Sequence, residues 1–171
     1  IPFPWVNYLT LMAKADIAFN DAYGDTIGVP PYKTFFGGGP DSVRGYKEHH
    51  LGPRDNFGNP YGGNLLMSAQ LEVILPMPQK WASRARFSMF FDIGNVFSTT
   101  EIDFFDKMGD PVDYDFDAGN LKQSFGLAAQ WLAPLGLFRF SYAMPLNDDS
   151  PTSTSWGDET ERFQFTIGGA F

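Results

Sequence analysis

Residues 138–144 of this 171-residue chain read Phe138-Arg139-Phe140-Ser141-Tyr142-Ala143-Met144. Every second side chain is large and apolar, and the side chains between them are polar or small. A period of two is the spacing at which successive side chains of a β-strand point to opposite faces of a sheet. The segment therefore predicts a strand with one apolar and one polar face.

Five further segments alternate in the same way, and their apolar faces run from Leu9 to Phe19, Leu65 to Leu75, Phe87 to Ile93, Phe125 to Trp131 and Phe163 to Ile167. A tilted strand crosses a bilayer in about 9–11 residues, whereas strands of soluble sheets average about 5–6 residues. The segments are close to the longer value. Their lengths favour strands that span a membrane.

The polar faces of these segments decide which way the sheet is turned. They carry ionisable and amide side chains, namely Lys14, Asp16, Gln70, Glu72, Arg86, Asp92, Gln130 and Arg139. Aromatic residues make up 17% of the chain, too many large side chains for the interior of a small barrel. We therefore predict an all-β fold, an antiparallel up-and-down transmembrane β-barrel with apolar faces toward lipid and polar faces around a wet lumen. The alternative is a soluble β-sandwich with the apolar faces inside.

The connections between the segments alternate in length. Residues 76–83 and 133–136 are short turns, whereas residues 21–63, 98–121 and 147–160 are long loops. Short turns on one side and long loops on the other are typical of outer-membrane barrels, whose long loops are extracellular. Because such barrels have at least about 8 strands, we expect further strands from a partner or from before residue 1. A start without Met or a signal peptide favours a truncated chain.

Several functional classes are disfavoured by composition. The net charge of −8 argues against a nucleic-acid partner, and the absence of cysteine excludes disulfides and thiol catalysis. His49 and His50 lack a metal-ligand spacing, and nothing in the sequence brings Ser42 and His49 into a catalytic triad. The acidic run 101–117 lacks the EF-hand pattern and is expected to be a solvated loop. We expect no metal, no cofactor and no enzymatic activity.

The first long loop carries the most specific signal. It contains Phe36-Gly37-Gly38-Gly39 followed by Val43-Arg44-Gly45-Tyr46. The glycines allow backbone conformations closed to other residues, and the following proline restricts φ, so a loop of fixed shape is expected. Val43-Arg44-Gly45-Tyr46 resembles the VRG[FY] motif of the BamA family of outer-membrane assembly factors. The resemblance spans essentially the whole chain, through residues 51–54, 62–64, 69–72, 90–94, 130–136, 140–143 and 163–165.

The resemblance implies a specific architecture. Residues 1–171 would be the C-terminal portion of the barrel, the last six strands of sixteen, with the loop at 21–63 folded back into the lumen. The family's loop arginine contacts acidic groups of the inner wall, which implies that role for Arg44. Glu72 and Asp92 lie on polar faces, and a guanidinium can bind a carboxylate in a bidentate manner. The alternative is that Arg44 is a surface charge whose pairing contributes no more than about 1 kcal/mol.

The C-terminal segment is the second signature. It is an amphipathic strand that ends in an aromatic residue and resembles the C-terminal β-signal of outer-membrane proteins; its expected seam residues are Phe163, Phe165, Ile167, Gly168, Gly169 and Phe171. In the family, the seam between the first and last strands is a lateral gate. Gly168 and Gly169 would weaken pairing there. The alternative is that this strand only closes the barrel.

The function expected from this resemblance is assembly and insertion of β-barrel proteins into the bacterial outer membrane through the seam at the last strand. The expected partners are nascent outer-membrane proteins, outer-membrane lipid and accessory assembly lipoproteins that act through N-terminal domains outside this chain. Three alternatives stay open: a related translocation or secretion pore, a passive channel, and a phospholipase-type enzyme.

Overall fold

The main element of the protein is a six-stranded sheet with the strand order β1-β3-β4-β7-β8-β10. The structure, a computed structural model, describes residues 9–22, 29–100 and 102–168. Every neighbouring pair of strands is antiparallel. The strands are β1 (Thr10–Phe19), β3 (Leu65–Ile74), β4 (Ala85–Phe97), β7 (Lys122–Ala133), β8 (Gly136–Pro145) and β10 (Phe163–Gly168). The predicted all-β, up-and-down arrangement is confirmed, and β1 and β10 form the two edges of a sheet that is not closed in this chain.

The strand bounds follow the predicted segments with one notable extension. β4 continues past Ile93 to Phe97, because Gly94 and Asn95 interrupt the apolar pattern without interrupting the pairing to β3. The structure adds short elements that have no periodicity to detect. These are β2 (Gly45–Tyr46), β5 (Phe104–Phe105), β6 (Pro111–Val112), β9 (Thr160–Glu161), α1 (Gln79–Ala82) and the 3-10 turns η1 (Pro31–Lys33) and η2 (Ala118–Asn120).

The two faces of the sheet are turned as the polar pattern predicted. Phe87, Leu127 and Phe163 are 47%, 58% and 58% exposed on the outer face, whereas Glu72 and Asp92 on the inner face are 3% and 0% exposed. A soluble sandwich would have the reverse arrangement. Aromatic rings of β7, β8 and β10 pack against one another on the outer face, through the pairs Trp131–Phe138, Phe138–Phe165, Phe140–Phe163 and Phe140–Phe165.

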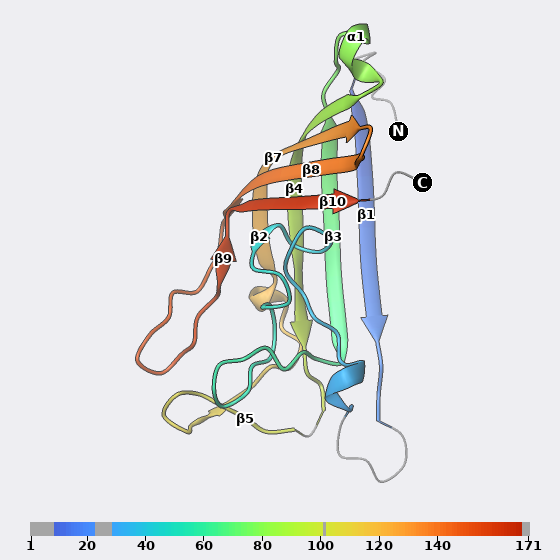
Figure 1. The fold of residues 1–171 in the computed structure, drawn as a ribbon. Helices are drawn as coiled ribbons and strands as arrows, with labels where there is room; N and C mark the ends of the chain where they lie inside the picture. Colours follow the sequence, from blue (N-terminus) through green and yellow to red (C-terminus); the bar gives the residue numbers. More distant parts are fainter. Residues whose placement is uncertain (1–8, 23–28, 101, 169–171) are drawn as a thin grey trace.

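The connections divide between the two ends of the sheet. Figure 1 shows α1 and the β7–β8 turn at one end and the long loops at the other, with the sheet curling around the segment that holds β2. This segment belongs to the loop between β1 and β3, so the first long loop folds back against the concave face. No helix in the described part of the chain is long and apolar enough to span a membrane.

The orientation of the sheet predicts where a charge is tolerated. Leu127→Arg on the outer face of β7 should lower the free energy of unfolding in lipid vesicles by about 2–4 kcal/mol, because it places a guanidinium in hydrocarbon. Met12→Arg is the matched control, since Met12 lies on the inner face and is 40% exposed. The free energy of unfolding of Met12→Arg should stay within about 0.5 kcal/mol of that of the parent protein. Equal unfolding midpoints in urea for the two variants would contradict the orientation.

Candidate functional site

Arg44 lies in the concavity of the sheet and is held by two carboxylates. Its Nε donates to Asp92 Oδ2 at 2.7 Å and its Nη2 donates to Asp92 Oδ1 at 2.8 Å, a bidentate pair. Its backbone N–H also donates to Asp92, and its Nη1 donates to Glu72 Oε2 at 3.2 Å. Burial acts to lower the pKa of Arg44, but the hydrogen bonds and charges of Asp92 and Glu72 outweigh burial and raise this pKa. The guanidinium is therefore permanently charged in its buried site.

An aromatic ring forms the floor under this guanidinium. Arg44 Cζ lies 3.5 Å from the centre of the Phe90 ring, within the range of a cation–π contact. Phe90 stands on the polar face of β4, and the space for its ring comes from Gly126 on β7. A Cβ added to Gly126 would lie 2.7 Å from Phe90 Cζ. The one large aromatic among the polar residues of this face is thus part of the arginine site.

Gly45 and Tyr46 extend the contacts of the loop to β8 and β10, toward the other edge of the sheet. Gly45 has a φ of +92°, and a Cβ built on it would lie 2.8 Å from the Cβ of Ala143 on β8. Tyr46 is fully buried, and its carbonyl accepts a hydrogen bond of 2.8 Å from Gln164 Nε2 on β10. Gly45 and Tyr46 also form β2, which pairs with β9 just before β10. The loop is therefore bonded to the last described strand.

The segment Asp41–Tyr46, called the lumen segment below, contacts all six strands of the sheet. Lys14 of β1 donates to the Asp41 carbonyl at 3.3 Å, and Gln70 of β3 donates to the Ser42 carbonyl at 2.9 Å. Arg44 contacts β3 and β4, Gly45 meets β8, and the Tyr46 carbonyl meets β10. The Tyr46 hydroxyl reaches β7 by donating to the Gln123 carbonyl at 3.3 Å. Six consecutive residues therefore span the whole inner face.

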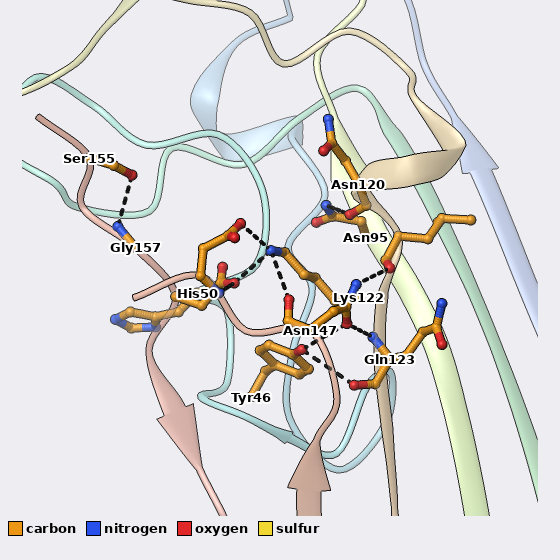
Figure 2. Close-up of polar contacts among 12 residues, drawn as sticks. Tyr46, His50, Asn95, Asn120, Lys122, Gln123, Asn147, Ser155 and Gly157 are labelled. Atoms are coloured by element: carbon orange, nitrogen blue, oxygen red, sulfur yellow. Dashed lines mark hydrogen bonds and ion pairs between the residues drawn. The ribbon is translucent and has the colours of Figure 1, made fainter. Parts of the chain in front are cut away.

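A second polar cluster fixes the loop between β8 and β10. Lys122, at the start of β7, is 7% exposed, and its Nζ lies 2.6 Å from both Asp149 Oδ2 and Asp158 Oδ2. Asn147 accepts from the Gln123 backbone N–H at 2.7 Å and from the Tyr46 hydroxyl at 3.3 Å. Figure 2 shows Tyr46, Gln123, Asn147 and Lys122 converging in this cluster. The tyrosine of the motif thereby joins the two loops.

Glu159 forms the remaining connection between these loops. Its carboxylate accepts from Lys47 Nζ at 2.7 Å and from Arg54 Nη1 at 3.1 Å, and lies 3.6 Å from His50 Nε2. The hydrogen bond from Lys47 lowers the pKa of Glu159, and Arg54 and His50 add to this against the opposing effect of burial. Sequence patterns gave no signal for Glu159 or Lys122, because their partners lie in loops without periodicity.

The other residues named from the sequence are distributed as follows. Val43 is 1% exposed and packs with Tyr46 and Leu51. Phe163, Phe165 and Ile167 lie on the outer face of β10, and Gly168 is the last described residue of that strand. Gly169 and Phe171 lie outside the described residues.

The weaker candidates Ser42 and His49 make local contacts within the first long loop. Ser42 Oγ accepts from the Gly38 N–H within the loop. His49 is exposed on the loop next to Glu48. Among residues 9–22, 29–100 and 102–168, no three His, Asp or Glu side chains converge as a metal site.

An antiparallel sheet with a lipid-compatible outer face, whose inner face holds a loop through a buried arginine, defines a segment of an outer-membrane β-barrel with an occupied lumen. A family model described as the Omp85 superfamily domain matches residues 1–171, and the chain belongs to this superfamily.

Two relatives share the name outer membrane protein assembly factor BamA. The chain is 37% identical to the protein of Neisseria meningitidis serogroup B over 185 positions, which cover 99% of the chain and 22% of the relative. It is 32% identical to the protein of Nitratidesulfovibrio vulgaris, over 84% of the chain and 16% of the relative. The resemblance to BamA proteins is confirmed, and the chain spans about a fifth of the length of these relatives.

The fold also matches a solved structure. The crystal structure of BamA from Haemophilus ducreyi lacking POTRA domains 1–3 superposes with a TM-score of 0.78 at 30% identity. The match covers 100% of this chain and 33% of that structure. The six strands therefore correspond to part of a larger barrel in that protein.

The arginine site makes a prediction about stability. Arg44→Ala leaves Asp92 and Glu72 buried without their cation, and removal of one partner from a buried ion pair costs about 3–5 kcal/mol. Arg44→Lys keeps the charge but loses the bidentate geometry, so its loss of unfolding free energy should be smaller than that of Arg44→Ala but still measurable. Unfolding of the intact protein in urea measures both variants, with exposed Lys33→Ala as the control. Equal stability of the Ala and Lys variants would contradict the role of the bidentate pair.

The close approach of Gly45 to β8 makes a second prediction. Gly45→Ala places a side chain in left-handed backbone, which costs about 1–2 kcal/mol, and brings its Cβ against Ala143. The double variant Gly45→Ala with Ala143→Gly removes the close contact but keeps the backbone strain. Its rate of proteolysis within the loop should therefore fall between those of the parent and Gly45→Ala. Protection in Gly45→Ala equal to that of the parent would mean that the loop does not need this approach.

Proposed function

We propose that this chain is the C-terminal part of an outer-membrane barrel that assembles other β-barrel proteins into the bacterial outer membrane. The observation that carries the proposal is that the lumen segment is bonded to β10, the last described strand of the sheet. β10 pairs on one side with β8, and its other side has no strand partner in the described part of the chain. Such an edge offers backbone donors and acceptors to an added strand.

The lumen segment supports this function by holding the sheet around the edge. A strand at the margin of a sheet with one neighbour is weakly restrained, and the bond from Gln164 to the Tyr46 carbonyl gives β10 a second attachment. The sheet can then present a defined edge to an incoming strand. The same segment lies across the concave face, an arrangement that fits a passive diffusion channel poorly.

The proposed reaction is strand addition without a covalent step. A terminal strand of the substrate would pair with the exposed edge, and its remaining strands would follow in turn, each satisfying the hydrogen bonds that lipid cannot. The partners are nascent outer-membrane proteins and the lipid of that membrane. Accessory assembly lipoproteins would act through domains outside this chain. The names of the relatives, both assembly factors, support this assignment.

Site-specific cross-linking tests the proposal, because the chain contains no cysteine. The intact protein carrying Ile167→Cys on β10 is reconstituted in vesicles with an unfolded barrel protein that has one cysteine in a terminal strand. We expect disulfide cross-links during assembly. The control is Phe91→Cys, on the outer face of β4 in the middle of the sheet, which should give none. Assembly of the substrate with equal cross-linking at both positions would exclude the edge of β10 as the site of addition.

A further inference from the structure

The end of the sheet with the short turns is basic in an otherwise acidic chain. The chain has 20 acidic residues and a net charge of −8, yet residues 73–91, 124–146 and 163–168 contain no Asp or Glu. The same ranges contain Lys80, Arg84, Arg86 and Arg139. Because all 20 acidic residues lie elsewhere, these ranges have a net charge of +4 and the rest of the chain has a net charge of −12.

Arg86 and Arg139 belong to one row of side chains on the inner face. The register pairs Arg86 with Gln130, Gln130 with Arg139 and Arg139 with Thr166 across four adjacent strands. Directly paired residues point to the same face, and these strands direct Asp92, Ser88 and Gln164 to the concave side in the same alternation. We call Arg86, Gln130, Arg139 and Thr166 the basic row.

The two guanidinium groups of the basic row have no side-chain partner among the described residues. Both side chains are exposed, and neither has a hydrogen bond, ion pair or ring contact with any residue in the described part of the chain. Arg44, Arg54 and Lys122, by contrast, are each bonded to carboxylates. Among the residues that the structure describes, the basic row therefore presents two cations without a carboxylate partner on the concave face.

The spacing of the row suits a polypeptide with several carboxylates. Adjacent strands are about 4.8 Å apart, so the Arg86 and Arg139 backbones are about 10 Å apart, with the Gln130 amide between them. Each guanidinium can bind a carboxylate with two parallel hydrogen bonds. A segment with acidic residues a few positions apart can reach both.

This chain itself carries a segment of this kind in one of its loops. In this chain, residues 101–117 contain seven acidic residues against Lys107 alone. Loops of this kind must pass from the side of the short turns to the opposite side while a barrel is assembled. We propose that the basic row is a docking surface on the lumen wall for acidic loop segments of a nascent barrel. This inference rests on the proposed assembly function, whose substrates it describes more closely.

Thiol modification at Gln130→Cys tests the surface without requiring assembly. The intact protein, with no other accessible cysteine, is treated in low salt with anionic and cationic methanethiosulfonates. The measured quantity is the modification rate with the anionic reagent divided by the rate with the cationic reagent. Because two cations lie nearby, this ratio should be at least about fivefold higher with both arginines present than in Arg86→Gln/Arg139→Gln. Hexaglutamate should slow modification, and hexalysine should not. A cysteine at exposed Ser153 gives the reference for both reagents and peptides.

Two results of this experiment overturn the docking surface. One is the same rate ratio with and without the arginines. The other is equal protection of the cysteine by inorganic phosphate and by hexaglutamate at the same concentration of negative charge. That result would assign the row to phosphate groups instead.

A second measurement connects the surface to assembly. Two versions of one substrate barrel are compared, with acidic loops and with those residues changed to Asn and Gln. The measured quantity is the assembly rate of the acidic substrate divided by that of the neutral substrate. Arg86→Gln/Arg139→Gln should lower this ratio several-fold, and Arg86→Lys/Arg139→Lys should largely restore it. Lys80→Gln on α1 should leave it unchanged. An unchanged ratio in the Gln variant overturns the inference. Failure of the parent protein to assemble either substrate would instead overturn the proposed function. The protection by hexaglutamate would still test the docking surface, because that measurement does not require assembly.

Discussion

The buried ion pair between Arg44 and Asp92 is the interaction on which the placement of the loop depends. Removing two opposite charges from water is unfavourable unless they meet in good geometry and their remaining polar atoms are satisfied. Here the guanidinium binds one carboxylate with two nitrogens, reaches Glu72 with a third, and rests on the ring of Phe90. Glu72 in turn accepts from the hydroxyl of Ser88. These contacts fix where the loop lies against β3 and β4.

The small residues of the inner face follow from the same constraint. Gly126 leaves room for the Phe90 ring under Arg44, and Ala143 leaves room for Gly45, so the backbone of the loop can approach β8 closely. Larger side chains would lift the loop from the wall and lengthen the bonds from Arg44. The polar face is therefore a surface shaped to one segment of its own chain as well as the lining of an aqueous space.

The sequence predicted the sheet more completely than the site. Period-two alternation locates every long strand, because one face of each strand meets lipid and the other meets water. Glu72 and Asp92 fall on the polar side of this alternation, which places both carboxylates on the face toward Arg44. The meeting of these three side chains was expected from family resemblance, since no local pattern encodes a contact across 48 positions. Glu159, Lys122 and the pairing of β2 with β9 were missed for a related reason. Two-residue strands and loop ion pairs have no periodicity, and their partners are decided only by the folded arrangement.

The contact of Gln164 with the Tyr46 carbonyl joins residues 118 positions apart. Such distant contacts form late, since the chain between them must first be ordered. The lumen segment lies on the concave side, bonded at both ends of its span to strands that curve around it. A loop in that position cannot easily be threaded into a finished cylinder. This geometry predicts an order for the protein's own folding, in which the loop settles against β3 and β4 before the C-terminal hairpin wraps over it.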